Sequence, residues 1–96
     1  MVKQLPKTVG NIEDGKQLVR SSGSVHANHI EANESLSKRD YYHRVKICRK
    51  EAKESRSWLR LVDTGHTENL DKERSDLVQE ATELMRIFGA IIEKGK

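Results

Sequence analysis

The stretch SKRDYYHRVKICRKEAKESRSWLRLV, residues 37–62, decides the fold of this chain. Apolar and small side chains recur in it at alternating intervals of four and three residues, a spacing that keeps them on one side of an α-helix. This seam consists of Tyr41, Val45, Cys48, Ala52, Ser55, Leu59 and Val62. We therefore expect one unbroken helix that buries one edge.

A second row on the same helix follows the same alternation and is basic at every position but one. At about 100° per residue it lies roughly a quarter turn from the seam. The row consists of Arg39, Tyr42, Lys46, Arg49, Lys53, Arg56 and Arg60. Its members recur about every 5 Å along the helix axis, which suits contacts to nucleic-acid phosphates without base reading. Tyr42 is a candidate for stacking on a base.

The positive charge of the chain is concentrated on this helix. The formal net charge is only +3, but residues 37–60 hold nine Lys or Arg against three Asp or Glu. Such a concentration attracts phosphate backbones or an acidic protein surface. A solvated face that only keeps the protein soluble is the alternative interpretation.

The composition favours one small helical domain in a reducing compartment. Hydrophobic residues make up 34% of the 96 residues and charged residues another 34%, which is typical of amphipathic helices. Cys48 has no partner for an internal disulfide, no segment approaches the roughly 20 apolar residues of a membrane span, and the N-terminus has no signal-peptide pattern. We expect a cytoplasmic protein without a membrane partner.

The rest of the chain predicts an all-α, antiparallel up-down bundle of three helices, because no strand-length alternating run is present. Residues 1–11 contain Pro6 and Gly10, follow no helical period, and read as a lead-in segment. Residues 12–96 then form a single domain with helices at about 12–34, 38–63 and 69–94.

Capping residues set these boundaries. Asn11 is the expected N-cap of the first helix, and Ser37 that of the second. Gly65 is expected to end the second helix in the left-handed conformation. Thr67 and Asn69 compete for the N-cap of the last helix.

Two further rows predict contacts beyond the seam. The first helix carries polar side chains at helical spacing: Gln17, Arg20, Ser24, Asn28 and Glu31. If these are buried they must bond one another or a partner, because an unpaired buried polar group costs about 1–3 kcal/mol. The second helix carries apolar side chains outside the seam, which predict an oligomer interface at Ile47, Trp58 and Leu61.

Neither catalysis nor a metal or other cofactor is expected. His26 and His29 are three residues apart and could share a helical face with Glu31 or His43, but no His-Glu-x-x-His pattern or second thiol accompanies them. Exposed or hydrogen-bonded imidazoles are the simpler interpretation. Cys48 occupies a packing position, and no phosphate-binding glycine loop is present.

Three groups of residues resemble a known family. They are Gln17-Leu18-x-Arg20, then Ser24-x-x-Ala27-Asn28-x-x-Glu31, and then Ile47-Cys48-Arg49 with Glu54 and Leu59. The chain is similar in these to the bacterial proteins encoded by intervening sequences in 23S ribosomal RNA genes. The resemblance runs from about Leu5 to Leu61 and continues more loosely through the last helix.

The resemblance implies a four-helix bundle that assembles as a homopentamer with a central channel. A related branch of the family serves as the accessory protein of diversity-generating reverse transcriptases, where a basic surface meets nucleic acid and polymerase. This chain begins where the first helix of the family should end, so we expect helices two to four only. It also has His26 and His29 where the family usually has a small and an aliphatic residue.

Together these patterns predict a non-enzymatic, self-associating bundle whose basic row binds RNA or DNA, with a reverse transcriptase as a possible further partner. A polar network within the bundle is expected at Gln17, Arg20, Ser24, Asn28, Glu31 and Glu54. The alternative is a structural oligomer or protein-interaction scaffold that does not bind nucleic acid.

Overall fold

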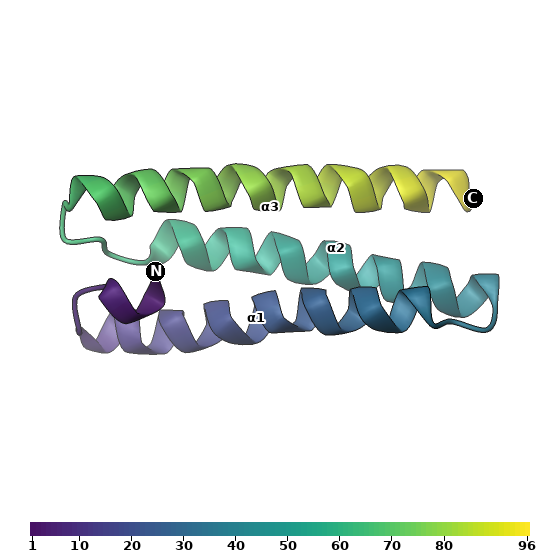
Figure 1. Cartoon of the computed structure of the whole chain (residues 1–96), viewed down its shortest axis with the longest axis horizontal. Helices are drawn as coiled ribbons and strands as arrows, with labels where there is room; N and C mark the ends of the chain where they lie inside the picture. The colour runs from purple at the N-terminus through teal and green to yellow at the C-terminus, as the bar shows by residue number, and fades with distance from the viewer.

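Three long helices run antiparallel in chain order, and the second lies between the other two (Figure 1). The computed structural model describes all 96 residues. A short 3-10 turn, η1 (Val2–Gln4), precedes the helices α1 (Val9–Asn33), α2 (Lys38–Leu61) and α3 (Glu68–Lys94). There is no strand, so the prediction of an all-α, antiparallel three-helix chain is confirmed.

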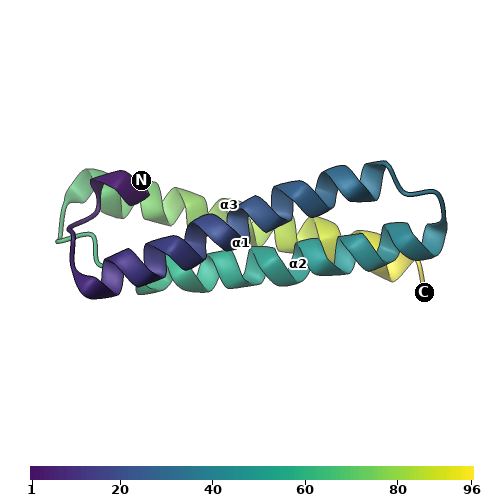
Figure 2. The same cartoon turned by 90° about the horizontal axis from the view of Figure 1, so that it is seen from below.

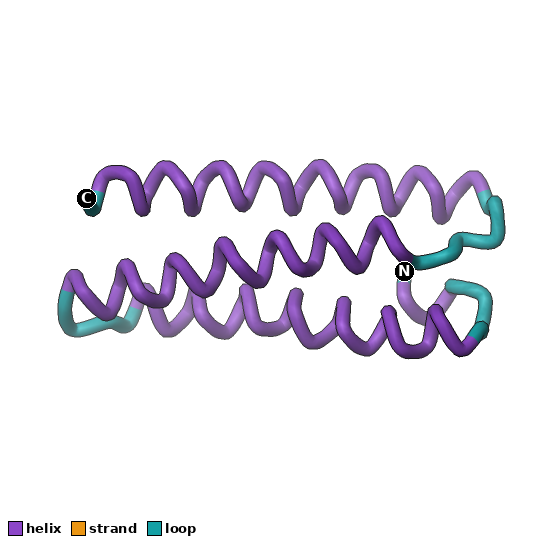
Figure 3. The backbone as a smooth tube through the Cα atoms, turned by 180° about the vertical axis from the view of Figure 1, so that it is seen from behind, coloured by secondary structure: helices purple, strands orange, loops and turns teal.

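The molecule is elongated, with principal extents of 45 × 19 × 15 Å. Seen from below, α1 is nearest the viewer and α3 lies behind it, with α2 running along both (Figure 2). A short turn joins α1 to α2 at one end, and a longer connection joins α2 to α3 at the other (Figure 3). No helix combines the length and the apolar character that a membrane crossing requires.

Helix α2 is unbroken from Lys38 to Leu61, as the seam predicts. The Ser37 hydroxyl caps it by accepting a hydrogen bond from the Asp40 N–H at 3.1 Å, which confirms that N-cap. The predicted end at residue 63, with Gly65 as the residue directly after the helix, is two residues too late. Helix α2 stops at Leu61, because Val62 turns to extended backbone and its side chain is buried. Gly65 does take the left-handed conformation, but within the α2–α3 connection.

Helix α1 begins at Val9, three residues earlier than expected, and the prediction of Asn11 as its N-cap is wrong. Thr8 is the N-cap, and its hydroxyl accepts a hydrogen bond from the Asn11 N–H at 3.1 Å. Asn11 is instead buried within the first turn, and its carboxamide bonds backbone groups outside the helix. A polar side chain that looked like a cap is therefore a tertiary contact.

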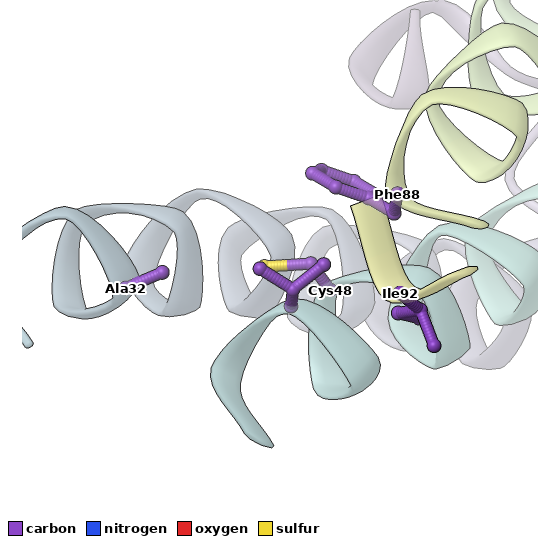
Figure 4. Close-up of a cluster of buried hydrophobic side chains, with 5 residues drawn as sticks. Ala32, Cys48, Phe88 and Ile92 are labelled. Atoms are coloured by element: carbon purple, nitrogen blue, oxygen red, sulfur yellow. The ribbon is translucent and has the colours of Figure 1, made fainter. Parts of the chain in front are cut away.

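Two hydrophobic clusters hold the opposite ends of the bundle together. The larger lies near the α1–α2 turn, draws on all three helices and includes the fully buried Cys48. Its members are Ala32, Val45, Cys48, Phe88 and Ile92 (Figure 4). The smaller lies at the α2–α3 connection and consists of Leu5, Val62 and Leu70.

Between the clusters, α1 and α2 meet through small side chains. Ser21 and Ser55 are buried, and their hydroxyl oxygens lie 2.8 Å apart. Ala52 on α2 is buried beside them in the seam. Small side chains allow two helices to approach closely, but they fill little of the space above the contact. In the middle of the bundle, α1 and α2 therefore pack closely along one line, and the space above that line, toward α3, is left open.

Candidate nucleic-acid interface

The basic face of α2 consists of six side chains, none of which has a carboxylate partner within 4.0 Å. Every one is exposed except Arg56, which is half-buried. They are Arg39, Lys46, Arg49, Lys53, Arg56 and Arg60. Cations without an internal partner keep their full charge available for an external anion.

The charges of α2 are sorted by side of the helix. Glu51 and Glu54 lie on the flank that faces α1, where both meet Arg20. The distances from Arg20 to the two carboxylates are 3.5 Å and 3.1 Å respectively. Because Arg20 engages these carboxylates from α1, they do not neutralise the basic face on the other side of α2.

Two members of the basic face lean over α3. Arg56 donates a hydrogen bond from Nη1 to the Thr82 hydroxyl at 3.2 Å. The Arg49 guanidinium passes over Gly89, where an added Cβ would lie 3.8 Å from it. Close to it on α3, Glu93 is bonded by Lys96 at 2.9 Å, which lowers the pKa of that carboxyl, with a smaller contribution from Arg49. The basic surface thus extends over the α2–α3 boundary.

The other four cations of the face make no side-chain hydrogen bond to the protein. They are Arg39, Lys46, Lys53 and Arg60, spaced seven residues apart along α2. Seven residues advance a helix by about 10 Å and leave side chains only about 20° out of line. Over the three steps from Arg39 to Arg60, these four side chains therefore form an outward row that turns by about 60° around α2.

Tyr42, the one aromatic residue of the predicted row, lies against the end of α3. Its ring is so close to Gly95 that a Cβ there would be 2.5 Å from the ring. It is also in edge-to-face contact with Tyr41, with 5.3 Å between ring centroids. The ring is half-buried, and its stacking on a base stays a prediction.

Five of the six residues predicted as one polar network lie in two separate clusters. In the first, Arg20 donates from Nε to Gln17 at 3.1 Å and pairs with Glu54. Glu51 joins this cluster, which the sequence reasoning missed. The signal was present, because Glu51 lies three residues before Glu54 and shares its side of the helix.

The second cluster forms nearer the α1–α2 turn. Asn28 donates to the Ser24 backbone oxygen at 2.9 Å and accepts a hydrogen bond from Arg44 at 3.0 Å. Arg44 was not among the predicted residues, although it lies seven residues before Glu51 on the same flank of α2. Glu31 was among the predicted residues. It is exposed, and its carboxylate makes no hydrogen bond or ion pair within the chain.

Comparison with known proteins identifies the family. A family model described as 23S rRNA-intervening sequence protein matches residues 1–90. The chain belongs to that family. A crystal structure of a protein with unknown function from the S23 ribosomal protein family of Bacteroides thetaiotaomicron superposes with a TM-score of 0.71 at 28% identity, over 90% of this chain and 75% of that one. No curated protein matches the chain.

In this 23S rRNA-intervening sequence family member, the predicted oligomer interface lies on the flank of α2 that faces α1. Ile47 and Trp58 are half-buried there, whereas Leu61 is 63% exposed. An isolated exposed leucine is common on protein surfaces. Its contact with another chain stays a prediction.

The histidines and Cys48 have packing and surface positions. His26 is exposed, and the His29 ring lies 6.3 Å from the Phe88 ring. No group of three or more His, Cys, Asp or Glu side chains is arranged to hold a metal ion. Burial raises the pKa of the Cys48 thiol, although a hydrogen bond with its own backbone opposes part of that shift. The thiol donates a hydrogen bond to the Val25 backbone oxygen at 3.7 Å. A thiol of this kind is a poor nucleophile near neutral pH.

The family member also has an apolar groove of about 330 Å³ between α1 and α3. Ala52 and Ser55 of α2 form its floor, and its walls include Val19 of α1, 58% exposed, and Leu84 of α3. At about 100° per residue, Lys53 lies well around α2 from Ala52, so the groove and the basic face are separate surfaces. The sequence reasoning missed the groove, which exists because small side chains on α2 lie under two widely separated helices.

Proposed function

We propose that this family member is a non-enzymatic protein that binds RNA or DNA through the basic face of α2. One observation supports the proposal above the others: six cations share a side of one rigid helix and none is neutralised within the chain. Binding to phosphates releases condensed counterions, which favours association at low salt. A merely solubilising surface does not require cations to be segregated from carboxylates in this way.

The test measures the salt dependence of binding in a charge-reversed variant. Lys46, Lys53 and Arg60 are changed together to Glu, and binding to a labelled nucleic acid is followed by fluorescence anisotropy. We expect the slope of log K against log salt to become shallower by about 3, since each phosphate contact contributes about 0.9. Unchanged affinity and slope in this variant would overturn the proposal.

A matched control separates a local interface from general charge attraction. Lys7, Lys16 and Lys72 are exposed and lie outside the basic face. Their change to Glu alters the net charge by the same amount. We expect this control to bind within about threefold of the wild type at physiological salt, because charges more than a Debye length from the ligand are screened. Equal losses in both variants would mean that binding is not localised to α2.

The apolar groove favours a second candidate function, a self-associating scaffold whose partner is another copy of the chain. Val19, which lines the groove, is 58% exposed, and Ile87, which lies outside the groove on α3, is 54% exposed. Exposed apolar surface of this kind marks interfaces between proteins. The pentamer implied by the family resemblance is one form that such an assembly can take.

Light scattering after size exclusion tests this candidate. Val19→Glu is expected to lower the oligomer mass if the groove is the interface, and Leu61→Asp if the surface of Ile47, Trp58 and Leu61 is. Both side chains are mostly exposed, so neither change should unfold the monomer. A wild-type chain that elutes as a monomer at all concentrations would exclude self-association, and nucleic-acid binding would then be judged on its own.

A further inference from the structure

We infer that the basic face selects double-helical nucleic acid over single strands, and that it recognises the shape of the phosphate backbone rather than bases. This inference rests on the proposed function and narrows its substrate class. Three features of α2 and its neighbours lead to it.

The first feature is the length of the outward row on one unbroken helix. Arg39, Lys46, Lys53 and Arg60 cover 21 residues of unbroken helix, which is about 31 Å at the usual rise per residue. B-form DNA repeats its backbone about every 34 Å, so the row is about as long as one turn of it. A rigid duplex presents phosphates at fixed positions over that length, whereas a flexible single strand must be ordered to do so and loses entropy.

The second feature is the absence of a free aromatic surface. Proteins that bind single strands without sequence preference combine a basic groove with aromatic rings on which bases stack. Of the four aromatic residues in the chain, Phe88 is buried and the others are half-buried. Tyr42 is the only one in the predicted row, and its ring is engaged by Gly95 and Tyr41. The face therefore offers charge without a stacking platform.

The third feature is the kind of side chain between the cations. Helix α2 contains no Asn or Gln, the residues that pair with adenine edges. The exposed side chains beside the row are His43, Lys50 and Ser57. Of the outward row, Lys46 and Lys53 serve as point charges toward phosphate, and Arg39 and Arg60 have guanidinium groups that match phosphate in a bidentate way. Binding should accordingly depend little on base sequence.

The experiment compares duplexes with their own strands. Duplex RNA and duplex DNA of about 20 base pairs, two helical turns, and each separated strand are titrated at one salt concentration. We expect at least one of the two duplexes to bind about tenfold or more tightly than its component strands, with duplexes of unrelated sequence within about threefold of one another. The RNA and DNA arms identify which duplex is preferred.

Tyr42→Leu adds a second measurement that separates the alternatives. Loss of single-strand binding in this variant would report a base stacked on the Tyr42 ring, because aromatic rings are the surfaces on which single-stranded bases stack. If single strands bind the wild type as tightly as duplexes do, and their affinity falls in the Tyr42→Leu variant, the inference is overturned but the proposed function stays intact. Binding to none of the probes would instead remove the proposed function itself, and the inference with it.

Discussion

The side-chain carboxamide of Asn11 pairs with both backbone groups of Asp63, 52 residues further along the chain. Its Nδ2 donates to the Asp63 oxygen at 2.7 Å, and its Oδ1 accepts from the Asp63 N–H at 2.8 Å. The same Nδ2 donates to the Pro6 oxygen at 2.8 Å. One nearly buried side chain thus fastens the N-terminal segment and the α2–α3 connection to the first turn of α1.

Asn11→Ala should destabilise the protein by about 2–3 kcal/mol, because it leaves backbone groups of Asp63 and Pro6 without partners in a partly buried site. Urea unfolding followed by circular dichroism measures the change. Asn33→Ala is the matched control, since Asn33 is exposed and its side chain makes no hydrogen bond. A loss no greater than that of the control would show that water replaces the Asn11 contacts freely.

Gly65→Ala should destabilise the protein by about 1–2 kcal/mol, since its φ is in the left-handed region and an added Cβ would lie 2.9 Å from Pro6 Cγ. Gly23→Ala, within α1 and with no atom near the added Cβ, should instead stabilise by about 0.5–1 kcal/mol. Thermal unfolding of each variant measures whether its melting temperature falls or rises relative to the wild type. Stabilisation by both changes would contradict the described geometry of the connection.

Arg20→Ala should cost about 1 kcal/mol, a modest amount because the Arg20 side chain is half exposed to solvent. The Glu51 Oε2 atom is buried without a hydrogen bond, and the Arg20 guanidinium at 3.5 Å compensates its charge. When Glu51 is also changed to Gln, Arg20→Ala should lower the unfolding free energy by less than it does in the wild type. A double-mutant cycle that gives no coupling energy between Arg20 and Glu51 would refute this account. Lys16→Ala, which breaks only the exposed pair with Glu13, should be nearly neutral.

Stability should fall at alkaline pH in a manner that depends on Cys48. Burial raises the pKa of this thiol, so the unfolded chain releases the proton before the folded chain does. The folded state then binds more protons, and its stability decreases as pH rises. The contribution of Cys48 is complete below about pH 8.5, the ordinary thiol value, and is lost as pH rises through the raised pKa.

Cys48→Ala removes this dependence. Between about pH 7 and pH 9.5 the wild type should lose more unfolding free energy than the variant, because only the wild type has a thiol to ionise. Tyr and Lys titrations are common to both chains and cancel in the difference. Parallel pH profiles for the two proteins would mean that the thiol is not shielded in the native state.

The predictions from sequence succeeded where a regular period decided the structure. The seam from Tyr41 to Val62 correctly predicted that α2 is one unbroken helix, because burying one edge demands the helical spacing. The Ser37 cap was correct because a local hydrogen bond to the third residue on needs no tertiary information.

Predictions failed where distant segments decide the role of a side chain. Asn11 has the residue type of an N-cap, but Asp63 and Pro6 determine its position. Gly65 has the residue type of a helix end, but burial of Val62 ends the helix earlier. The polar row of α1 was divided by its partners on α2, Glu51 in one cluster and Arg44 in the other, and a single helix does not reveal its partners.

The position of α2 between two outer helices governs how the molecule comes apart. The outer helices α1 and α3 have little backbone contact with each other, so each depends on packing against α2. If either outer helix detaches, the remaining two-helix hairpin exposes about half of its apolar surface to water. The folded state of such a hairpin has little stability on its own. The last amides to exchange with deuterium should therefore be those of the central helix, and opening of one flank should loosen the other.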